Sequence, residues 1–286
     1  MKITDLTATV VRVPYPHAFH PAWFNGQPQP YLESVVVEVH TDTGLTGIGA
    51  SSTGAGHLVK RAVETVIKPM LIGMDPRASE RWIIALREAA LFTVRPWLVG
   101  IALWDIIGKA AGMPLYLLWG GAQDRLLAYA STGELASPDT SPELALRFLE
   151  EGFKAIKLRL HHETIAQDVA CVEAVRNAVG DRMAILVDAN QANVGALGGP
   201  VWDYSRAKAT ALELEQLGVL WLEEPLRRLD YSGLSRLCRE VDLAIAGGEL
   251  NLWLEEMYLL WEQDCYDILQ PDCTWVEDVG QLRKIA

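Results

Sequence analysis

The chain has 286 residues, half of them hydrophobic and 22% charged, and a formal net charge of −12. These values are typical of a globular protein that forms one large or two moderate domains around a buried core. The negative charge argues against nucleic acid or an anionic membrane as a partner. No apolar run could span a bilayer, and residues 1–5 carry no apolar signal segment, so we expect a cytoplasmic protein.

The four cysteines show no CxxC spacing and the six histidines show no HExxH spacing. These patterns give no support to a structural zinc site or a zinc hydrolase. We therefore expect reduced thiols at Cys171, Cys238, Cys265 and Cys273.

Residues 1–125 are predicted to form an α+β capping domain. A meander of three strands comes first, with a hairpin turn at Asp42-Thr43-Gly44 between the second and the third. Three helices follow, with breaks at Pro69 and at residues 73–76, and the last helix should end at Gly112. The expected strands are Ile3–Val13, Glu33–Thr41 and Leu45–Ser51, and the expected helices span 57–71, 77–91 and 94–111.

The segment from His17 to Tyr31 shows no helix or strand pattern and is predicted to be a 15-residue loop. Long loops in compact domains are often lids over a ligand. Phe19, Trp23 and Phe24 could serve such a lid, or could simply anchor the loop on the core. His17 and His20 would suit a hydroxylated ligand.

Residues 126–286 alternate between strand and helix patterns, which predicts parallel strands joined by right-handed crossovers. Ser141 as N-cap followed by Pro142 at the first helical position is typical of a helix start. Six strands are visible, so an α/β barrel of eight strands would need two further βα units beyond Ala286. An open doubly wound sheet would need none, but no glycine-rich phosphate loop follows the first strand. The expected strands are 126–131, 155–161, 183–188, 219–223, 244–249 and 267–272, and the helices 141–151, 163–179, 203–217, 232–240 and 252–263.

Polar residues recur at the ends of these strands. Side chains alternate across a strand, so Lys157, Arg159 and His161 should share the face toward the barrel interior. Asp188 follows 29 residues after Arg159, Glu223 comes 35 residues later and Glu249 a further 26, each at the C-terminal end of an apolar strand, where barrel active sites lie. Three converging carboxylates require a counter-charge, and oxygen ligands suit a hard cation such as Mg²⁺. Glu224 should face the other way and form polar contacts at the rim.

At these residues the chain resembles the enolase superfamily, and within it the mandelate racemase and muconate-lactonizing group. The motifs that carry the resemblance extend over nearly the whole chain. They are the helix around Trp104-Asp105 with Trp119-Gly120-Gly121, then Lys157-x-Arg159, residues 187–191, 221–225, Gly248-Glu249 and residues 269–272.

The resemblance implies an enzyme that uses Mg²⁺ to remove the proton α to a carboxylate through an enediolate. It implies Asp188, Glu223 and Glu249 as metal ligands, and Lys157 and Arg159 as the catalytic pair of the second strand. It also implies Asn190 as a substrate contact and Asp272 as the acid that orients a histidine on the next strand. We expect a small carboxylate substrate, contacted also by His20 and Trp23 of the loop, and a homo-oligomer.

The expected reaction is dehydration of an acid sugar, with racemisation of a 2-hydroxy acid as the alternative. Two departures from the family pattern bear on it. Arg159 stands where the family has a second lysine, and an arginine stays protonated, so the base is either Lys157 or a residue beyond Ala286. Glu277-Asp278 replace a glycine pair. A further alternative is an inactive, truncated relative.

Overall fold

The computed structural model describes residues 1–24, 27–52, 54–193 and 199–285. The chain forms two compact units that alternate along the sequence. The first comprises Met1–Pro16, Pro30–Leu126 and Asp272–Ala286, and the second His17–Gln29 and Leu127–Pro271. The segment 17–29 thus belongs with the strands and helices of the second half, and the last fifteen residues belong with the first half.

The first unit contains a three-stranded sheet in the order β1-β2-β3, made of β1 (Ile3–Phe19), β2 (Gln29–Thr41) and β3 (Thr46–Ser52). β2 and β3 are antiparallel, with Val37 opposite Gly49. Val35, Val37 and Val39 alternate toward the core and are fully buried. Gly44 has a φ of 83° in the connecting turn, a conformation that glycine adopts without strain. The predicted hairpin is therefore present.

The first two strands are longer than their hydrophobic patterns indicate. β1 continues to Phe19 and β2 begins at Gln29, so the prediction of a 15-residue loop without strand structure is wrong in its extent. Proline disfavours the helical conformation of the residue before it, and Pro14 and Pro16 keep this stretch extended. Most residues of this extension are exposed, so no alternation of apolar and polar residues marks it in the sequence.

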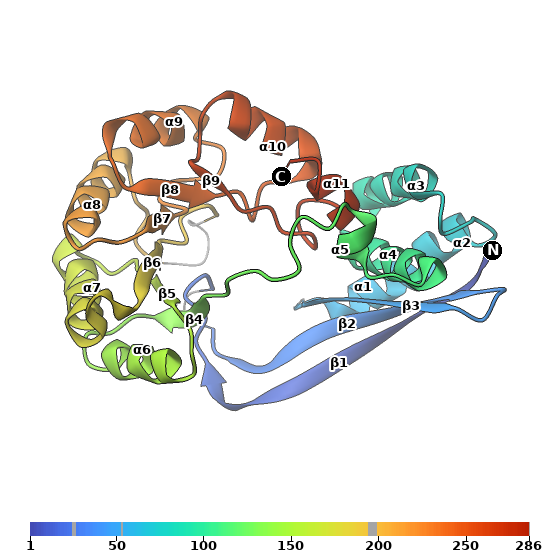
Figure 1. Cartoon of the computed structure of the whole chain (residues 1–286), viewed down its shortest axis with the longest axis horizontal. Helices are drawn as coiled ribbons and strands as arrows, with labels where there is room; N and C mark the ends of the chain where they lie inside the picture. The colour runs from blue at the N-terminus through green and yellow to red at the C-terminus, as the bar shows by residue number, and fades with distance from the viewer. Residues whose placement is uncertain (25–26, 53, 194–198, 286) are drawn as a thin grey trace. The chain divides into compact units, whose positions relative to one another are not determined.

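The helices of the first unit follow the predicted order. α1 (Gly56–Ala62), a π-helical turn (Val63–Ile67) and α2 (Lys68–Leu71) run without interruption, so Pro69 does not break the helix there; it lies in the first turn of α2. α3 (Ser79–Phe92), α4 (Trp97–Ala111) and α5 (Leu115–Leu118) follow, and Gly112 ends α4 in the left-handed conformation, as predicted. α4 packs on β3 because Gly47 and Gly49 have no side chains: a Cβ on either would lie 2.0 Å from a carbonyl oxygen of α4 (Figure 1).

The segment after residue 271 packs on α3 and α4. Glu277 is fully buried and forms a bidentate ion pair with Arg87 of α3. Asp278 caps the short helix α11 (Val279–Leu282) and accepts a hydrogen bond of 2.9 Å from the Trp104 indole of α4. Glu277 and Asp278 therefore attach this segment to α3 and α4.

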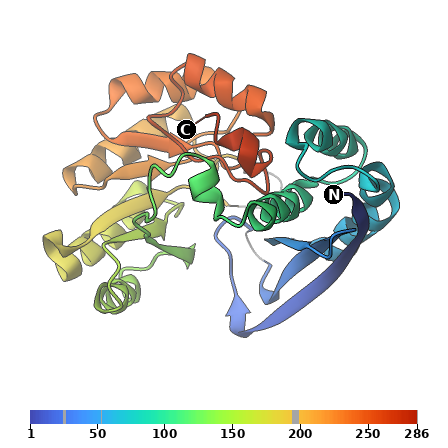
Figure 2. The same ribbon diagram turned by 45° about the vertical axis from the view of Figure 1, so that its right-hand side comes forward.

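The second unit contains six parallel strands in sequential order, with helices along the outer side of the row (Figures 1 and 2). This is the α/β-barrel architecture predicted from the sequence, with six strands in the described part of the chain. The strands are β4 (Ala130–Leu135), β5 (Ala155–Arg159), β6 (Ala184–Asp188), β7 (Trp221–Glu223), β8 (Ala244–Gly247) and β9 (Ile268–Leu269). The helices are α6 (Ser141–Glu150), α7 (Ile165–Val179), α8 (Tyr204–Gln216), α9 (Tyr231–Glu240) and α10 (Trp253–Glu262).

Two local predictions in the second unit are wrong. The first strand begins at Ala130 and not at residue 126, since Leu126 and Leu127 are 82% and 94% exposed and cannot serve as core residues. The N-cap of α6 is Thr140 and not Ser141. The Ser141 hydroxyl instead accepts a hydrogen bond from the Ser137 amide, which closes the preceding turn.

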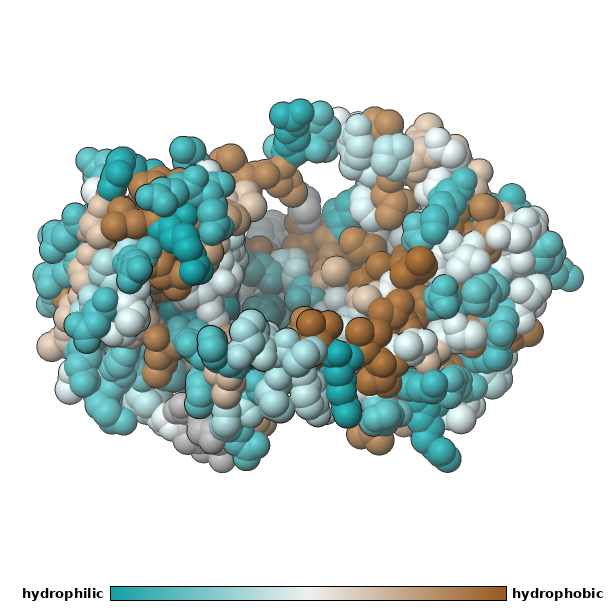
Figure 3. Space-filling model, turned by 90° about the horizontal axis from the view of Figure 1, so that it is seen from below, coloured by the Kyte–Doolittle hydropathy of each residue, from teal (hydrophilic) through white to brown (hydrophobic). Residues whose placement is uncertain are grey.

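All four cysteines are free thiols, as predicted. In the described residues no helix is both long enough and apolar enough to cross a membrane. Hydrophobic residues are visible among hydrophilic ones on the face drawn in Figure 3. The large exposed apolar side chains include Phe92 of α3 and Trp261 of α10. Scattered apolar residues of this kind do not by themselves define a partner surface.

Candidate active site

The candidate site is built on the interior faces of β5, β6 and β7. Ile156 and Leu158 of β5 are fully buried on the helix side, so Lys157 and Arg159 share the opposite face, where both are also buried. Arg159 lies in register with Asp188, and Asp188 with Glu223, at the C-terminal ends of three neighbouring strands. The parallel register thus brings two cations and two carboxylates to one end of the sheet.

Lys157 lies between the two carboxylates. Its Nζ donates to Glu223 Oε1 at 2.7 Å and is 3.5 Å from Asp188 Oδ2. The Tyr129 ring centroid lies 5.6 Å from the same nitrogen. The Lys157 ammonium group is therefore positioned by two carboxylates and lies next to an aromatic ring.

Arg159 is fixed by several acceptors at once. Its Nη1 forms an ion pair with Asp188 Oδ2. Its Nε donates to the Thr132 carbonyl at 2.9 Å, and its Nη2 to the Ser131 hydroxyl at 3.2 Å. Since a guanidinium remains charged in proteins, Arg159 serves this site as a stationary cation and not as a proton acceptor.

Burial and mutual repulsion dominate the electrostatics of the acids. Burial, and then the charge of Glu223, raise the pKa of Asp188 to about 7. Burial also opposes the charged forms of Glu223 and Lys157, but their attraction for each other and for neighbouring opposite charges outweighs it. The pKa of Glu223 is consequently lowered and that of Lys157 is raised. The buried carboxylates of Asp188 and Glu223 therefore favour the binding of positive charge close to them.

Glu224 does not lie at a solvated rim, contrary to the prediction. The strand ends at Glu223, and Glu224 adopts a φ of 48° that turns it inward, where it is 97% buried. Its Oε1 has no hydrogen-bond partner among the described residues. Burial, followed by the charges of Asp188 and Glu249, raises the pKa of Glu224 well above its usual range. An inward carboxyl with an unpaired oxygen adds to the demand for a cation.

Glu249 lies beyond β8, which ends at Gly247, and its side chain is half-buried. Its charge acts on Glu224, so it belongs to the same acidic neighbourhood. In the ranges that the structure describes, no three histidine, cysteine or acidic residues are grouped to hold a metal ion. The donors are nonetheless all carboxylate oxygens at adjacent strand ends, which is the donor set that Mg²⁺ prefers.

Asn190 and Asp272 differ in their surroundings. The backbone N–H of Asn190 donates to Asp188 Oδ1 at 2.8 Å, and the Asn190 side-chain oxygen lies 3.5 Å from Arg159 Nη1. Its φ of 50° aims it back at the cluster. The Asp272 carboxylate accepts bonds from the Thr274 amide and hydroxyl at 2.5 and 2.6 Å, as in a local turn. Its predicted catalytic role stays a prediction.

The two loop residues predicted to contact substrate lie in the second unit. His20 is exposed, and its backbone amide donates to Glu134 Oε1 at 2.7 Å. The Trp23 ring is half-exposed and lies 5.1 Å from Arg159 Cζ. The structure thus places Trp23 beside the cluster, while the binding roles of both residues stay predictions.

Sequence reasoning gave no role to several residues that support the cluster. Gln270 donates to Glu223 Oε2 at 3.1 Å, and Tyr129, Ser131 and Thr132 flank the two cations as described above. The only sequence signal was position: Gln270 belongs to the motif at 269–272, Tyr129 and Ser131 lie in the predicted strand 126–131, and Thr132 follows it directly. β4 is irregular between Ser131 and Leu135, next to the two residues that accept hydrogen bonds from Arg159, and no spacing reveals this irregularity.

The fold and the site together define a class: a barrel-type α/β domain with an α+β cap, carrying acids and bases at the C-terminal strand ends. Comparison with known proteins agrees. Residues 6–120 match the family model for the mandelate racemase / muconate lactonizing enzyme N-terminal domain, and residues 141–286 match the enolase C-terminal domain-like family model. The chain belongs to the mandelate racemase and muconate-lactonizing group of the enolase superfamily.

Similar curated proteins include arabinonate dehydratase of Saccharolobus solfataricus, 30% identical over 89% of this chain and 69% of its own length. Another is L-talarate/galactarate dehydratase of Salmonella typhimurium, 31% identical over 91% of this chain and 66% of its own length. A crystal structure of a racemase from Streptomyces coelicolor with bound magnesium matches with a TM-score of 0.89 at 25% identity. That match covers 99% of this chain and 79% of the racemase chain. The chain thus spans about two thirds of the two dehydratases.

Proposed function

We propose that this protein catalyses Mg²⁺-dependent removal of the proton α to a carboxylate, and that the overall reaction is dehydration of an acid sugar. The observation that carries the proposal is the register of Arg159, Asp188 and Glu223, with Lys157 bonded to Glu223 at 2.7 Å. Similar proteins named as acid-sugar dehydratases support the choice of substrate class.

Asp188, Glu223 and Glu249 would hold the magnesium ion. The fit rests on their oxygen donors, on the unpaired Oε1 of buried Glu224, and on the burial and repulsion that raise the pKa of Asp188. When bound, the ion would supply positive charge to the substrate carboxylate as negative charge develops on it. A similar racemase structure contains magnesium, which supports the assignment.

Lys157 is the proposed base among the residues of this chain, because Arg159 stays protonated. The neighbouring carboxylates raise the pKa of Lys157, and a divalent cation bound to them would lower it again. The alternative is that the base is another residue. Arg159, held by Asp188, Thr132 and Ser131, would stabilise negative charge without accepting a proton. Asn190 would contact the substrate through its side-chain amide.

The loop residues and Asp272 complete the assignment. Trp23, whose ring lies 5.1 Å from Arg159 Cζ, would form one wall of the substrate site, and His20 would bind a hydroxyl group. Asp272 would orient a histidine on the next strand. In the dehydration, the substrate loses its α-proton and then its β-hydroxyl, which departs as water after protonation.

The test is a panel of aldonates and aldarates incubated in D₂O with Mg²⁺ and, separately, with EDTA. The expected result is incorporation of deuterium at the α-carbon of recovered substrate and formation of a 2-keto-3-deoxy acid that carries solvent deuterium at C3, both abolished by EDTA. Lys157→Met should abolish exchange, whereas Lys208→Met, at an exposed ion pair on α8, should not. Exchange that persists in Lys157→Met would move the base role to another residue.

Racemisation of a 2-hydroxy acid is the second candidate, favoured by the magnesium-bound racemase among similar structures. The same experiment separates the two reactions. Deuterium incorporation with inversion at the α-carbon and no loss of water indicates a racemase. Absence of both exchange and turnover over the whole panel would contradict both reactions and leave an inactive relative.

A further inference from the structure

We propose that His161 is a positioning residue that latches the segment 19–23 onto the second unit and thereby holds the Trp23 ring over Arg159. The catalytic consequence rests on the proposed function, but the latch itself does not. His161 lies just beyond β5, two residues after Arg159, and the alternation of side chains places it on the same interior face.

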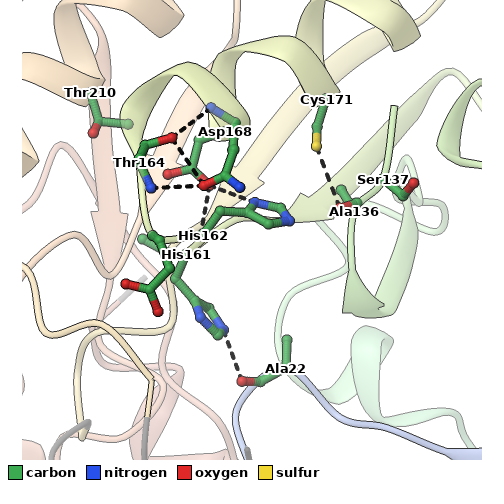
Figure 4. Close-up of polar contacts among 12 residues, drawn as sticks. Ala22, Ala136, Ser137, His161, His162, Thr164, Asp168, Cys171 and Thr210 are labelled. Atoms are coloured by element: carbon green, nitrogen blue, oxygen red, sulfur yellow. Dashed lines mark hydrogen bonds and ion pairs between the residues drawn. The ribbon is translucent and has the colours of Figure 1, made fainter. Parts of the chain in front are cut away.

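The latch is a buried hydrogen bond. His161 Nε2 lies 2.9 Å from the Ala22 carbonyl oxygen, and both residues are about 95% buried (Figure 4). Burial lowers the pKa of His161, which favours the neutral ring, and the carbonyl partner requires the remaining proton on Nε2. Because water cannot reach the site freely, losing this donor leaves a buried carbonyl unpaired.

The irregular strand β4 forms the other side of the latch. Ser131 pairs with Lys157 and Leu135 with Arg159, so β4 contains two more residues than β5 between these pairs. The extra residues receive the loop: the Gly133 carbonyl accepts from the Ala22 amide at 2.9 Å, and Glu134 accepts from His20. A Cβ on Gly133 would lie 2.4 Å from the Phe19 ring, which occupies that space. The bulge thus serves as a receptor for residues 19–22.

Ala22 is therefore held at both of its backbone polar groups, and Trp23 follows it directly. The Trp23 ring lies 5.1 Å from Arg159 Cζ and 5.8 Å from the Phe19 ring. The Arg159 guanidinium and the Phe19 ring, which both lie close to the indole, define its position. Any displacement of Ala22 would uncover the guanidinium that is paired with Asp188.

The neighbouring histidine, His162, points the other way and provides a matched control. Its Nδ1 lies 2.8 Å from Asp168 Oδ1, and Asp168 is fully buried and also paired with Arg206 at 2.6 Å (Figure 4). This network ties the turn after β5 to α7 and α8 and makes no contact with Ala22. The network therefore stabilises the turn that carries His161, but it is not part of the hydrogen bond between His161 and Ala22.

The test is hydrogen exchange of the 17–24 peptide, together with chymotrypsin cleavage after Phe19, Trp23 and Phe24. His161→Phe keeps a ring but removes the donor, and we expect exchange and cleavage to accelerate about tenfold. His161→Gln keeps an N–H in reach of Ala22 and should exchange within about threefold of wild type. His162→Gln should leave this peptide unchanged, even if it accelerates exchange around α7.

Wild-type exchange and cleavage in His161→Phe would overturn the proposal, as would equal acceleration in His161→Gln and His162→Gln. Peptides of β6 serve as the reference, because global destabilisation would accelerate them equally. If His161→Phe does not fold, His161→Asn carries the same test, since its shorter amide cannot reach Ala22. In an active enzyme the loosened variants should raise KM more than they lower kcat; exchange reports on the latch whether or not the chain is active.

Discussion

Asp278 occupies the space beside Gly100 of α4 that any side chain there would need. A Cβ on Gly100 would lie 2.5 Å from Asp278 Oδ1 and 3.3 Å from its Cγ. The carboxylate cannot move away freely, because it accepts hydrogen bonds from the Trp104 indole and the Gly280 amide, both at 2.9 Å. A missing side chain on one helix thus makes room for an acid that attaches a distant segment.

Gly100→Ala is therefore expected to destabilise the protein by about 1–2 kcal/mol, since overpacking outweighs the gain of about 1 kcal/mol in helix propensity. Gly108→Ala on the same helix is the control, because its Cβ would meet its nearest atom only at 3.3 Å. The measurement is urea unfolding. In an Asp278→Ala background the cost of Gly100→Ala should disappear; a cost that persists there would refute the steric explanation.

Asp278 should also give stability a pH dependence. Burial raises its pKa to about 6, against about 3.9 for an unfolded aspartate. Below about pH 4 the carboxyl is protonated in both states. Between about pH 4 and 6 the folded state retains more protons than the unfolded state, so the free energy of unfolding falls as pH rises, by roughly 3 kcal/mol.

Asp278→Asn cannot titrate and should lack this fall. The difference in unfolding free energy, variant minus wild type, is expected to increase by roughly 2–3 kcal/mol between about pH 4 and 6.5. Other titrating groups contribute equally to the unfolding free energies of the two proteins, so their contributions cancel in this difference. Urea unfolding at several pH values measures it, and parallel curves for the two proteins would show that Asp278 does not titrate in this range.

The ion pair between Arg87 and Glu277 should respond asymmetrically to mutation. Glu277 is fully buried, while the Arg87 side chain is 35% exposed. Arg87→Met removes the bidentate partner of a fully buried carboxylate and should cost about 2–4 kcal/mol, whereas Glu277→Gln leaves a guanidinium that can turn to water and should cost about 1 kcal/mol.

Arg77→Met, at the more exposed pair with Asp75, is the control and should cost less than about 1 kcal/mol. Thermal and urea unfolding of the three variants measure how much stability each one loses and so rank the three costs. Equal costs for Arg87→Met and Glu277→Gln would show that the burial of the carboxylate does not decide the energetics.

Asp188→Asn tests the proposed metal site. The substitution removes a negative charge from the proposed ligand set, so Mg²⁺ affinity should fall about 100-fold or more in calorimetric titration. Asp203→Asn, at the N-cap of α8, is the control and should bind Mg²⁺ as the wild type does. Wild-type affinity in Asp188→Asn would mean that the carboxylate trio is wrongly assigned.

The sequence by itself determined the elements and their order. Apolar runs that end in Asp188 and Glu223 and alternate with helix patterns predicted parallel strands, and the alternation around Lys157 and Arg159 placed both cations on the interior face, as observed. These features are local, because side-chain direction follows from strand geometry alone. The family motifs were local as well, and the family models match them.

Only the tertiary structure decided what depends on contacts between distant residues. Residues 17–29 belong to the second unit through the bonds of Ala22 with His161 and Gly133, and residues 272–286 belong to the first through Glu277 and Asp278. The inward turn of Glu224 requires a positive φ that its position in the motif did not reveal. Spacing shows which residues reach the same end of a sheet, but a bulge, a missing side chain or a single backbone torsion decides which of them touch.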